Sequence, residues 1–389
     1  MIILARWLSV EDYASLALTM ALVGYLVYVA GLDFYVSAHR EFLSRRFTLD
    51  QVVKAQALVL AAGLTLAAPL LWLLLADRDG LARIAAVTGL LIGEAVCAEL
   101  SRLLIVVGRP TVANVVNFLK AAGWMLPVLI AGPWMASESM LSVLYAAWGF
   151  GLLIACSLGL WGLRLPPGRW LRSGPTADLI RRHVRVMPTL VAGTLALRAV
   201  FSLDRVFVEW AQSATLLAPY ALFAGMGAAF MALVDAGVVA RLYPSLVTAI
   251  MDGKLDEARH LKQTMFARTA ALIALMAATL WLGLDLLLEF IGRVEYSEQA
   301  HLAWIVAAAY ACHALSMPFH FILYGLSRDR LLTRIHLAAA VLLCLLGVFA
   351  ALVERGDWVA WAVLTSFLYM MIHKCSAATA ALGSAHGSR

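Results

Sequence analysis

Residues 140–163 read MLSVLYAAWGFGLLIACSLGLWGL, a run of 24 residues that contains no charged side chain. At about 1.5 Å of rise per residue, a helix of this length extends about 36 Å, which exceeds the roughly 30 Å of a bilayer's hydrocarbon core. Backbone that crosses lipid must satisfy its own hydrogen bonds. The run is therefore predicted to form a transmembrane helix.

Ten further stretches have the same character. Each is about 20 residues long, predominantly apolar, and bounded by charged residues or by glycine and proline. Together with the first stretch, they occupy approximately 13–36, 52–75, 83–107, 111–131, 140–163, 187–210, 218–240, 265–291, 301–326, 331–353 and 358–379. The predicted fold class is an all-α polytopic membrane protein with about eleven transmembrane helices.

The composition excludes a soluble globule. Hydrophobic residues make up 63% of the chain and charged residues 14%, whereas soluble domains have about 45–50% and about 25%. The formal net charge is +6, but the basic residues lie in short loops between apolar runs, which indicates topology and no nucleic-acid partner. The five cysteines lack a CxxC spacing, and we predict no disulfide framework, no metal site and no cofactor.

Lysine and arginine are distributed unequally between the two sides of the predicted membrane. One set of alternate loops, together with the C-terminal end, holds nineteen of them, and the opposite set holds five. By the positive-inside rule, the first set and the C-terminus are cytoplasmic. The N-terminus is then outside. One explanation is that residues 1–5 are the last turn of a first helix that begins upstream, and a true eleven-helix protein is the alternative.

The longest loop divides the chain into two predicted lobes. It contains Pro166-Pro167-Gly168 and Gly174-Pro175, which break helices, and then an amphipathic stretch whose arginines would face lipid headgroups. We predict an N-terminal lobe over 1–163 with five helices, a cytoplasmic linker over 164–186, and a C-terminal lobe over 187–389 with six. A weak internal repeat supports this division, because DYASLALTMALVGYLVYVAGL is echoed by PYALFAGMGAAFMALVDAGVV.

Four junctions between apolar runs read LARWLSVEDYASLALTMALVGYLVYVAGLDFYVSAHREF, SLDRVFVEWAQSATLLAPYALF, LYPSLVTAIMDGKLDEARHLKQTM and GLSRDRLLTRIHLAAAVL. They resemble, in the same order, junctions of the polysaccharide flippases in the multidrug/oligosaccharidyl-lipid/polysaccharide exporter superfamily. The resemblance covers nearly the whole chain. It implies two six-helix lobes around a central cavity, alternating access, and an undecaprenyl-pyrophosphate-linked oligosaccharide as substrate.

The resemblance also implies a setting. The protein would lie in the bacterial cytoplasmic (inner) membrane, with the phospholipid bilayer around it. It would serve the synthesis of a surface polysaccharide such as lipopolysaccharide O-antigen or exopolysaccharide, alongside other polysaccharide-assembly membrane proteins. The chain departs from the family at its start, where most of the first helix is absent.

Three basic residues inside the predicted helices are candidates for binding the pyrophosphate. A charge at the bilayer centre costs roughly 2.5–3.5 kcal/mol on the insertion scale, so it usually faces a water-filled cavity or a partner. Arg198 lies mid-helix, and its guanidinium suits phosphate oxygens, with a glutamate of another helix as the alternative partner. Lys120 shares a polar stripe with two asparagines, which fits either a cavity or a helix interface. Arg102 is the third candidate, although Glu99 is spaced to pair with it.

Four other residues are candidates for ion coupling or gating. Glu94 has no partner on its own helix, so it could neutralise the mid-helix arginine or lysine, or carry a coupling proton or ion. Asp204 and Arg205 match the family's Asp-Arg pair, which implies either a gate or an interfacial anchor. His320 lies seven residues after another histidine, and it fits either proton coupling or a satisfied structural role.

These features favour a transporter over an enzyme. The outer loops have about ten residues or fewer, and their acids form no spaced catalytic pair, so we predict no catalytic residues of a membrane-embedded polysaccharide polymerase or glycosyltransferase. The chain also lacks a Walker lysine loop. A multidrug exporter of the same superfamily is the other alternative. The deep arginine and lysine favour an anionic substrate instead.

Overall fold

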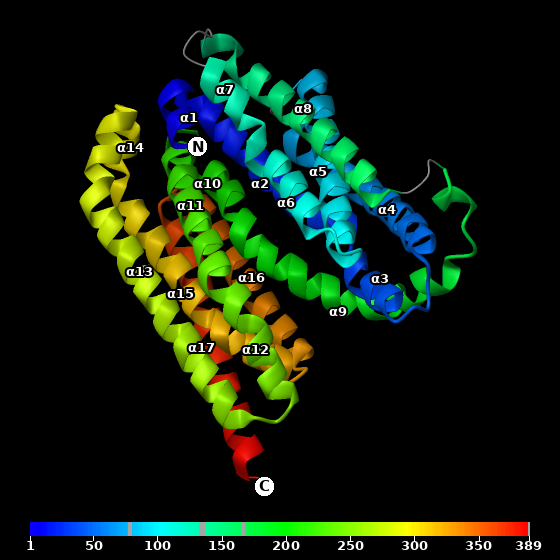
Figure 1. The fold of residues 1–389 in the computed structure, drawn as a ribbon. Helices are drawn as coiled ribbons and strands as arrows, with labels where there is room; N and C mark the ends of the chain where they lie inside the picture. The colour runs from blue at the N-terminus through cyan, green and yellow to red at the C-terminus, as the bar shows by residue number, and fades with distance from the viewer. Residues whose placement is uncertain (77–79, 132–136, 165–167, 213, 388–389) are drawn as a thin grey trace. The chain divides into compact units, whose positions relative to one another are not determined.

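The protein is built mostly of long helices (Figure 1). A computed structural model describes residues 1–76, 80–131, 137–164, 168–212 and 214–387. Within these residues, eleven helices are long and apolar enough to cross a membrane, and no strand occurs. The predicted all-α fold with eleven spans is confirmed.

The helices follow one another with short connections. The first half of the chain contains α1 (Ile2–Trp7), α2 (Val10–Gly31), α3 (Phe34–Leu43), α4 (Leu49–Leu75), α5 (Leu81–Val106), α6 (Pro110–Phe118), η1 (Leu119–Gly123), α7 (Met125–Ala131) and α8 (Ser137–Leu163). The second half contains η3 (Trp170–Arg172), α9 (Ala177–Ser202), α10 (Asp204–Gln212), α11 (Ala214–Val234), η4 (Asp235–Val239), α12 (Ala240–Met251), α13 (Leu255–Ile291), α14 (Val294–Glu298), α15 (Ala300–Gly325), α16 (Asp329–Leu352) and α17 (Trp358–Gly387). Elements η1 and η4 are π-helical turns within longer helices, and η3 is a 3-10 turn.

Two spans begin ten residues earlier than hydropathy predicts. Helix α9 starts at Ala177 where the apolar run starts at 187, and α13 starts at Leu255 where the run starts at 265. The first turns of both helices are polar and amphipathic, so hydropathy locates the lipid-facing part and not the helix end. The predicted amphipathic stretch 177–186 is therefore the beginning of α9, continuous with the span that follows it.

The chain forms two compact units. One, here the N-terminal unit, consists of Leu18–Leu195, and the other, the C-terminal unit, consists of Met1–Ala17 and Ala196–Arg389. This division by compactness falls inside α9 and assigns α1 and the start of α2 to the C-terminal unit. The lobe boundaries derived from the sequence, at 163 and 187, stay a prediction.

A helix cap and a close backbone contact stabilise helix α4 in the N-terminal unit. Helix α4 begins with a capping box, in which Thr48 accepts from the Gln51 backbone and the Gln51 side chain accepts from the Thr48 backbone. Further along, α4 meets α2 at Gly63, where an added Cβ would lie 2.0 Å from the carbonyl oxygen of Ala30. Only a glycine permits the two helices to approach this closely.

Helix α15 is the centre of the C-terminal unit. It packs against α11, α12, α13 and α17, and α13, α15 and α17 can be followed side by side in Figure 1. Glycines again permit close contacts, because a Cβ at Gly227 would lie 2.5 Å from the Tyr310 ring, and one at Gly347 would lie 2.6 Å from the Phe207 ring. The unit is thus built around aromatic side chains packed onto helix backbone.

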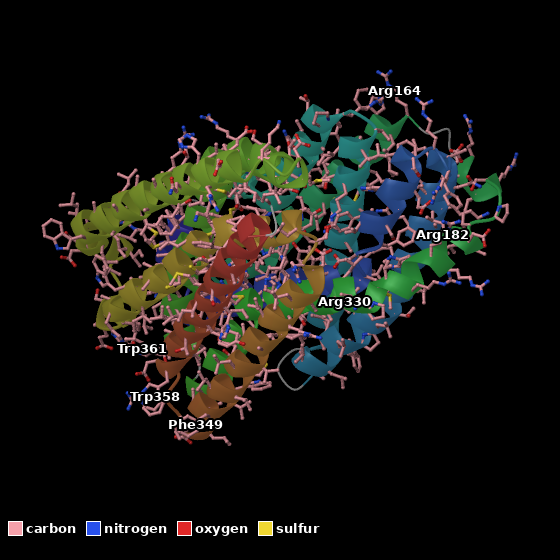
Figure 2. All side chains as sticks on the ribbon, turned by 90° about the horizontal axis from the view of Figure 1, so that it is seen from below. Arg164, Arg182, Arg330, Phe349, Trp358 and Trp361 are labelled. Carbon is pink, nitrogen blue, oxygen red and sulfur yellow. The ribbon has the colours of Figure 1, made fainter. Side chains whose placement is uncertain are left out.

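The hairpin of α16 and α17 carries different side chains at its two ends (Figure 2). Phe349, Trp358 and Trp361 lie at one end of these helices, and Arg330 lies at the other. The Phe349 and Trp358 rings stack with centroids 5.9 Å apart, and all three aromatic side chains are exposed. Aromatic side chains at one interface and arginine at the other are typical of a helix hairpin that spans a bilayer.

Candidate functional site

Lys120 is held by an ion pair between two helices of the N-terminal unit. Its ammonium lies 3.0 Å from Oε2 of Glu94, and Nε1 of Trp148 donates a 2.9 Å hydrogen bond to Oε1 of the same carboxylate. The Lys120 and Glu94 side chains are 22% and 12% exposed. Of the two cations that the sequence offered as partners for Glu94, the structure brings Lys120 to it.

A π-helical turn presents Lys120 to this carboxylate. The turn, η1, interrupts the helix formed by α6 and α7, and π turns within helices frequently mark functional sites. Next to it, the Trp124 and Trp148 rings stack with centroids 5.7 Å apart. Gly151 permits this contact, since a Cβ there would lie 2.7 Å from Cβ of Trp124. The stacked rings are buried, so they fix the carboxylate that Trp148 binds.

Arg102 belongs to a second polar cluster of the N-terminal unit. Its guanidinium bonds to Glu99, as the spacing predicts, and Gln56 of α4 donates to the other Glu99 oxygen. The guanidinium also lies over the Tyr35 ring, 4.0 Å from the centroid. A Cβ at Gly31 would lie 3.0 Å from Glu99 Oε1. Glycine at that position therefore leaves room for the pair.

Two titratable side chains of α3, outside the spans, lie next to this cluster. Burial and, after it, the positive charge of Arg102 lower the pKa of His39 from 6.5 to about 4. Burial also raises the pKa of Tyr35, and Arg102 opposes that rise. His39 is therefore neutral at pH 7, and Arg102 supplies the positive charge of this cluster.

Asp204 and Arg205 form a buried network within the C-terminal unit. Asp204 accepts from the Arg205 guanidinium at 2.9 Å and from the Tyr220 hydroxyl at 2.7 Å. Arg205 also donates to the Phe201 carbonyl at 2.7 Å and is hydrogen-bonded to Tyr310. The network ties α10 to α9, α11 and α15. This arrangement fits an anchor at least as well as it fits a gate.

Arg198, in α9, faces an acid of the same unit. It interacts electrostatically with Asp235, the first residue of the π turn η4. The sequence offered a glutamate as the alternative to a substrate, and the acidic residue that the structure provides is an aspartate. The two π turns of the described chain thus each carry one charged residue of a candidate pair, Lys120 in η1 and Asp235 in η4.

His320 belongs to a buried basic cluster, part of which the sequence did not indicate. Its ring stacks on His336 with centroids 5.8 Å apart and planes 9° apart. Lys374 interacts electrostatically with His320 and with His313. The topology count treats Lys374 as a cytoplasmic charge, yet its side chain is 1% exposed. Lys374 thus lies within a helix and not in a loop, because α17 continues to Gly387, past the end of the apolar run, and its cytoplasmic position stays a prediction. A lysine five residues inside that run was the available signal.

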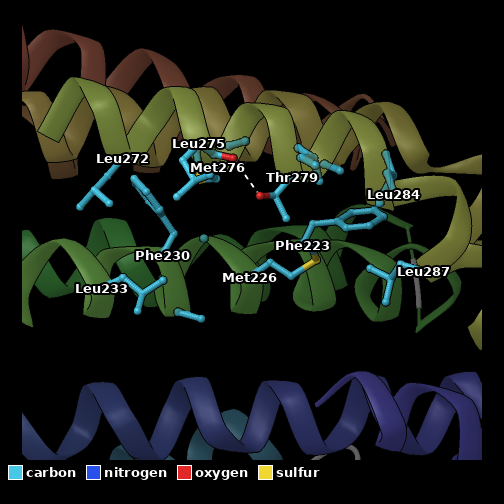
Figure 3. Close-up of a pocket in the computed structure, with 16 residues that line it drawn as sticks. Phe223, Met226, Phe230, Leu233, Leu272, Leu275, Met276, Thr279, Leu284 and Leu287 are labelled. Carbon is cyan, nitrogen blue, oxygen red and sulfur yellow. Dashed lines mark hydrogen bonds between the residues drawn. The ribbon is translucent and has the colours of Figure 1, made fainter. Parts of the chain in front are cut away.

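An apolar cavity of about 420 Å³ lies in the C-terminal unit between α11, α13 and α15. Phe223, Met226 and Phe230 of α11 converge there with leucines and Met276 of α13 (Figure 3). Thr279 contributes the polar group nearest the cavity, but its hydroxyl already donates to the Leu275 carbonyl at 2.8 Å. The lining therefore suits a hydrocarbon and offers no group for a charged ligand.

Solved structures of transporters share this fold. A structure described as the inward-facing conformation of a multidrug resistance MATE family transporter of the MOP superfamily is matched with a TM-score of 0.76 and 12% identity, over 99% of this chain and 94% of that one. The chain has the fold of this transporter. MATE in a bent conformation is matched with a TM-score of 0.56 and 9% identity, over 99% and 94%. MATE in complex with MaL6 is matched with a TM-score of 0.58 and 14% identity, over 99% and 93%.

The likeness to known proteins is one of fold. No protein-family model and no curated protein sequence matches the chain. The structure matched with a TM-score of 0.76 is described as a member of the MOP superfamily, and its fold is the one that the resemblance in the sequence leads us to expect.

Proposed function

We propose that the chain is a membrane transporter that works by alternating access and moves an undecaprenyl-pyrophosphate-linked oligosaccharide from the inner to the outer leaflet. The transporter fold over 99% of the chain supports the first part. The four junction sequences that resemble polysaccharide flippases support the second. The proposal places the protein in the bacterial inner membrane, with its C-terminus in the cytoplasm, in the synthesis of a surface polysaccharide.

The observation that carries the anionic substrate is the set of basic side chains inside the spans. Lys120 and Arg102 are each held by a carboxylate that a pyrophosphate could replace. A guanidinium offers a planar fork to phosphate oxygens, and an ammonium offers a point charge. We propose that Arg198, Lys120 and Arg102 bind the head group during the cycle, and that Glu94 takes Lys120 back when the substrate leaves.

The lipid part of the substrate needs an apolar surface. The cavity between α11 and α13 has one, and the exposed side chains of Leu233 and Leu275 form part of its rim. A prenyl chain could lie there while its head group moves, so that the hydrocarbon never crosses water.

The proposed function is tested in a strain deleted for the gene. Undecaprenyl-pyrophosphate-linked oligosaccharide is quantified on each leaflet, with wild type, Arg198→Ala or Arg330→Ala added back. Arg330 lies at the end of α16 and is the matched control (Figure 2). We expect accumulation on the inner leaflet that wild type and Arg330→Ala relieve and Arg198→Ala does not. Normal flipping with unpolymerised repeat units on the outer leaflet would indicate a later enzyme and contradict the proposal.

A multidrug exporter is the second candidate. Two observations favour it. The structure matched with a TM-score of 0.76 is described as a multidrug resistance transporter. In addition, a carboxylate partner faces each of Lys120, Arg102 and Arg205, which reduces the net positive charge inside the spans. In the same deletion strain, this function predicts increased sensitivity to cationic drugs with normal leaflet distribution of the oligosaccharide. The flippase predicts the reverse pattern.

A further inference from the structure

Lys374 is the most deeply buried basic side chain of the C-terminal unit. It lies in α17, which packs against both α15 and α16, and it is 1% exposed. A lysine inside a membrane span is rare, and it usually has a partner or faces water. Its position within a tightly packed helix trio requires an explanation.

Three histidines form one cluster with this lysine, two through direct electrostatic interaction with it and the third through the other two. His313 and His320 come from α15, and His336 comes from α16. His313 interacts electrostatically with Lys374, His336 and Arg198, and His320 interacts with Lys374, His336 and His313. His313 and His336 are each 5% exposed. Nδ1 of His313 and Nδ1 of His320 are buried and make no hydrogen bond in the described structure.

The cluster has an excess of basic groups. Elsewhere in the described spans and at their ends, Lys120 faces Glu94, Arg102 faces Glu99, and Arg205 faces Asp204. No carboxylate among the described residues pairs with Lys374. An ammonium in a low dielectric without a counter-charge is costly, whereas an imidazole can hold or release a proton near neutral pH. Proton exchange is therefore the chemistry that these four groups share.

Aromatic rings separate this cluster from the acidic network of the same unit. The Phe201 and Phe367 rings lie 4.8 and 5.0 Å from the His313 ring, and 5.8 and 6.0 Å from the Tyr310 ring. Tyr310 belongs to the Asp204 and Arg205 network. The two rings thus pack against both His313 and Tyr310, and Asp204 is already paired with Arg205, so Asp204 is not the counter-charge of the basic cluster.

Other charged and titratable groups lie around the cluster on the helices that pack against it. Helix α9 contributes Arg198, which Asp235 of η4 faces in turn. Helix α10 contributes the Asp204 and Arg205 pair beyond the aromatic rings, and α11 contributes Tyr220 to the same pair. On either side of His320 along α15, Lys262 of α13 lies over the Phe319 ring, and the Tyr243 ring of α12 contacts Phe321. The described carboxylates of these helices, Asp204 and Asp235, face arginines, and neither is paired with a member of the cluster.

We propose that Lys374, with His313, His320 and His336, forms a proton-binding centre inside the C-terminal unit. The cluster takes up one proton and releases it, and no other group is transferred. His313 also interacts electrostatically with Arg198. The charge of the centre therefore acts on Arg198, which we assign to binding of the substrate head group. The proton site itself is independent of the substrate, and its coupling to transport rests on the proposed function.

The proton site is tested on the full chain in lipid nanodiscs by ¹⁵N NMR of labelled histidine side chains, whose shifts report ring protonation. The variant Lys374→Met removes the charge and leaves an apolar side chain in an apolar setting. Lys254→Met is the matched control, because Lys254 is exposed and pairs with Asp252. Signals are assigned with His313→Gln and His320→Gln, and these variants also serve if the methionine variant does not fold.

We expect Lys374→Met to move the pH midpoint of the His313 or His320 ring by about one pH unit or more, as for charges a few ångströms apart in a protein interior, and Lys254→Met to leave it unchanged. Should His313→Gln serve in its place, the midpoint of His320 is expected to move. Rings that do not titrate between pH 4 and 9, or midpoints that ignore Lys374, would overturn the proposal. Midpoints that depend on chloride would also overturn it, because the centre would then hold an anion.

Coupling is tested separately in vesicles that contain purified protein and the lipid-linked oligosaccharide. We expect a pH gradient to accelerate wild-type flipping several-fold and to have no effect on Lys374→Met, which should still equilibrate the substrate. If wild type does not flip the substrate at all, the proposed function fails and the NMR result stands. If Lys374→Met responds to the gradient like wild type, the coupling role is wrong.

Discussion

Replacing Gly63 with alanine tests the closest helix contact of the N-terminal unit. The new Cβ would lie 2.0 Å from the carbonyl oxygen of Ala30 and 2.9 Å from its Cα, whereas a carbon and an oxygen in contact are about 3.3–3.6 Å apart. Helices α2 and α4 would have to separate by more than 1 Å. Neither partner atom is on a flexible side chain, so the strain cannot be relieved locally.

The expected cost follows from two opposing effects. Overpacking typically costs about 1–3 kcal/mol, and a backbone clash belongs at the upper end. Alanine returns up to about 1 kcal/mol through its better helix propensity. We expect a net destabilisation of about 2 kcal/mol, which lowers the melting temperature of a protein of 389 residues by about 2–3 °C.

The assay is thermal unfolding of the purified protein in detergent, followed by intrinsic tryptophan fluorescence. Gly89→Ala is the matched control, because Gly89 lies in the span α5 and has no atom within 4 Å of a new Cβ. This variant should melt at or slightly above the wild-type temperature. Equal melting of Gly63→Ala and wild type would refute the packing argument.

Three other perturbations have expected outcomes. His39 has a pKa of about 4 in the folded protein and 6.5 in the unfolded chain. As the pH falls from 6.5 to 4, the folded protein should therefore lose up to about 3 kcal/mol of stability. The melting temperature of His39→Gln should fall less than that of wild type across the same range. Glu94→Gln should destabilise by about 2–3 kcal/mol in thermal melts, and adding Lys120→Met should restore most of it. Tyr220→Phe should cost about 1.5 kcal/mol in the same melts, since Asp204 loses one donor.

Much of the fold could be predicted from the sequence because lipid imposes a simple rule. Every long, predominantly apolar run, such as 140–163, corresponds to a span in the structure. The rule concerns the lipid-facing part alone, and for that reason it missed the polar first turns of α9 and α13. It also could not foresee the end of α9 at Ser202, where the apolar run continues to 210.

The candidate pairs divide by the distance between partners along the chain. Glu99 and Arg102 lie on one helix face, so spacing alone predicted their ion pair. Glu94 and Lys120 belong to different helices, and the sequence could only name Lys120 as one of two partners. Lys374 escaped notice because a lysine near the end of an apolar run is usually an interfacial anchor. Its burial depends on packing by α15 and α16, which hydropathy does not encode.

The π turn at Leu119–Gly123 has a consequence for how this helix tolerates insertions and deletions. Compared with an α-helix, a π turn accommodates one additional residue without lengthening the hydrogen-bonded ladder at either side. Deleting a single residue there would let the turn relax to α-helix and keep both flanking segments in register with their neighbours. The same deletion elsewhere in a span would rotate everything after it by about 100°. If the deleted residue is Lys120, the helix loses its charge while both flanking segments keep their register.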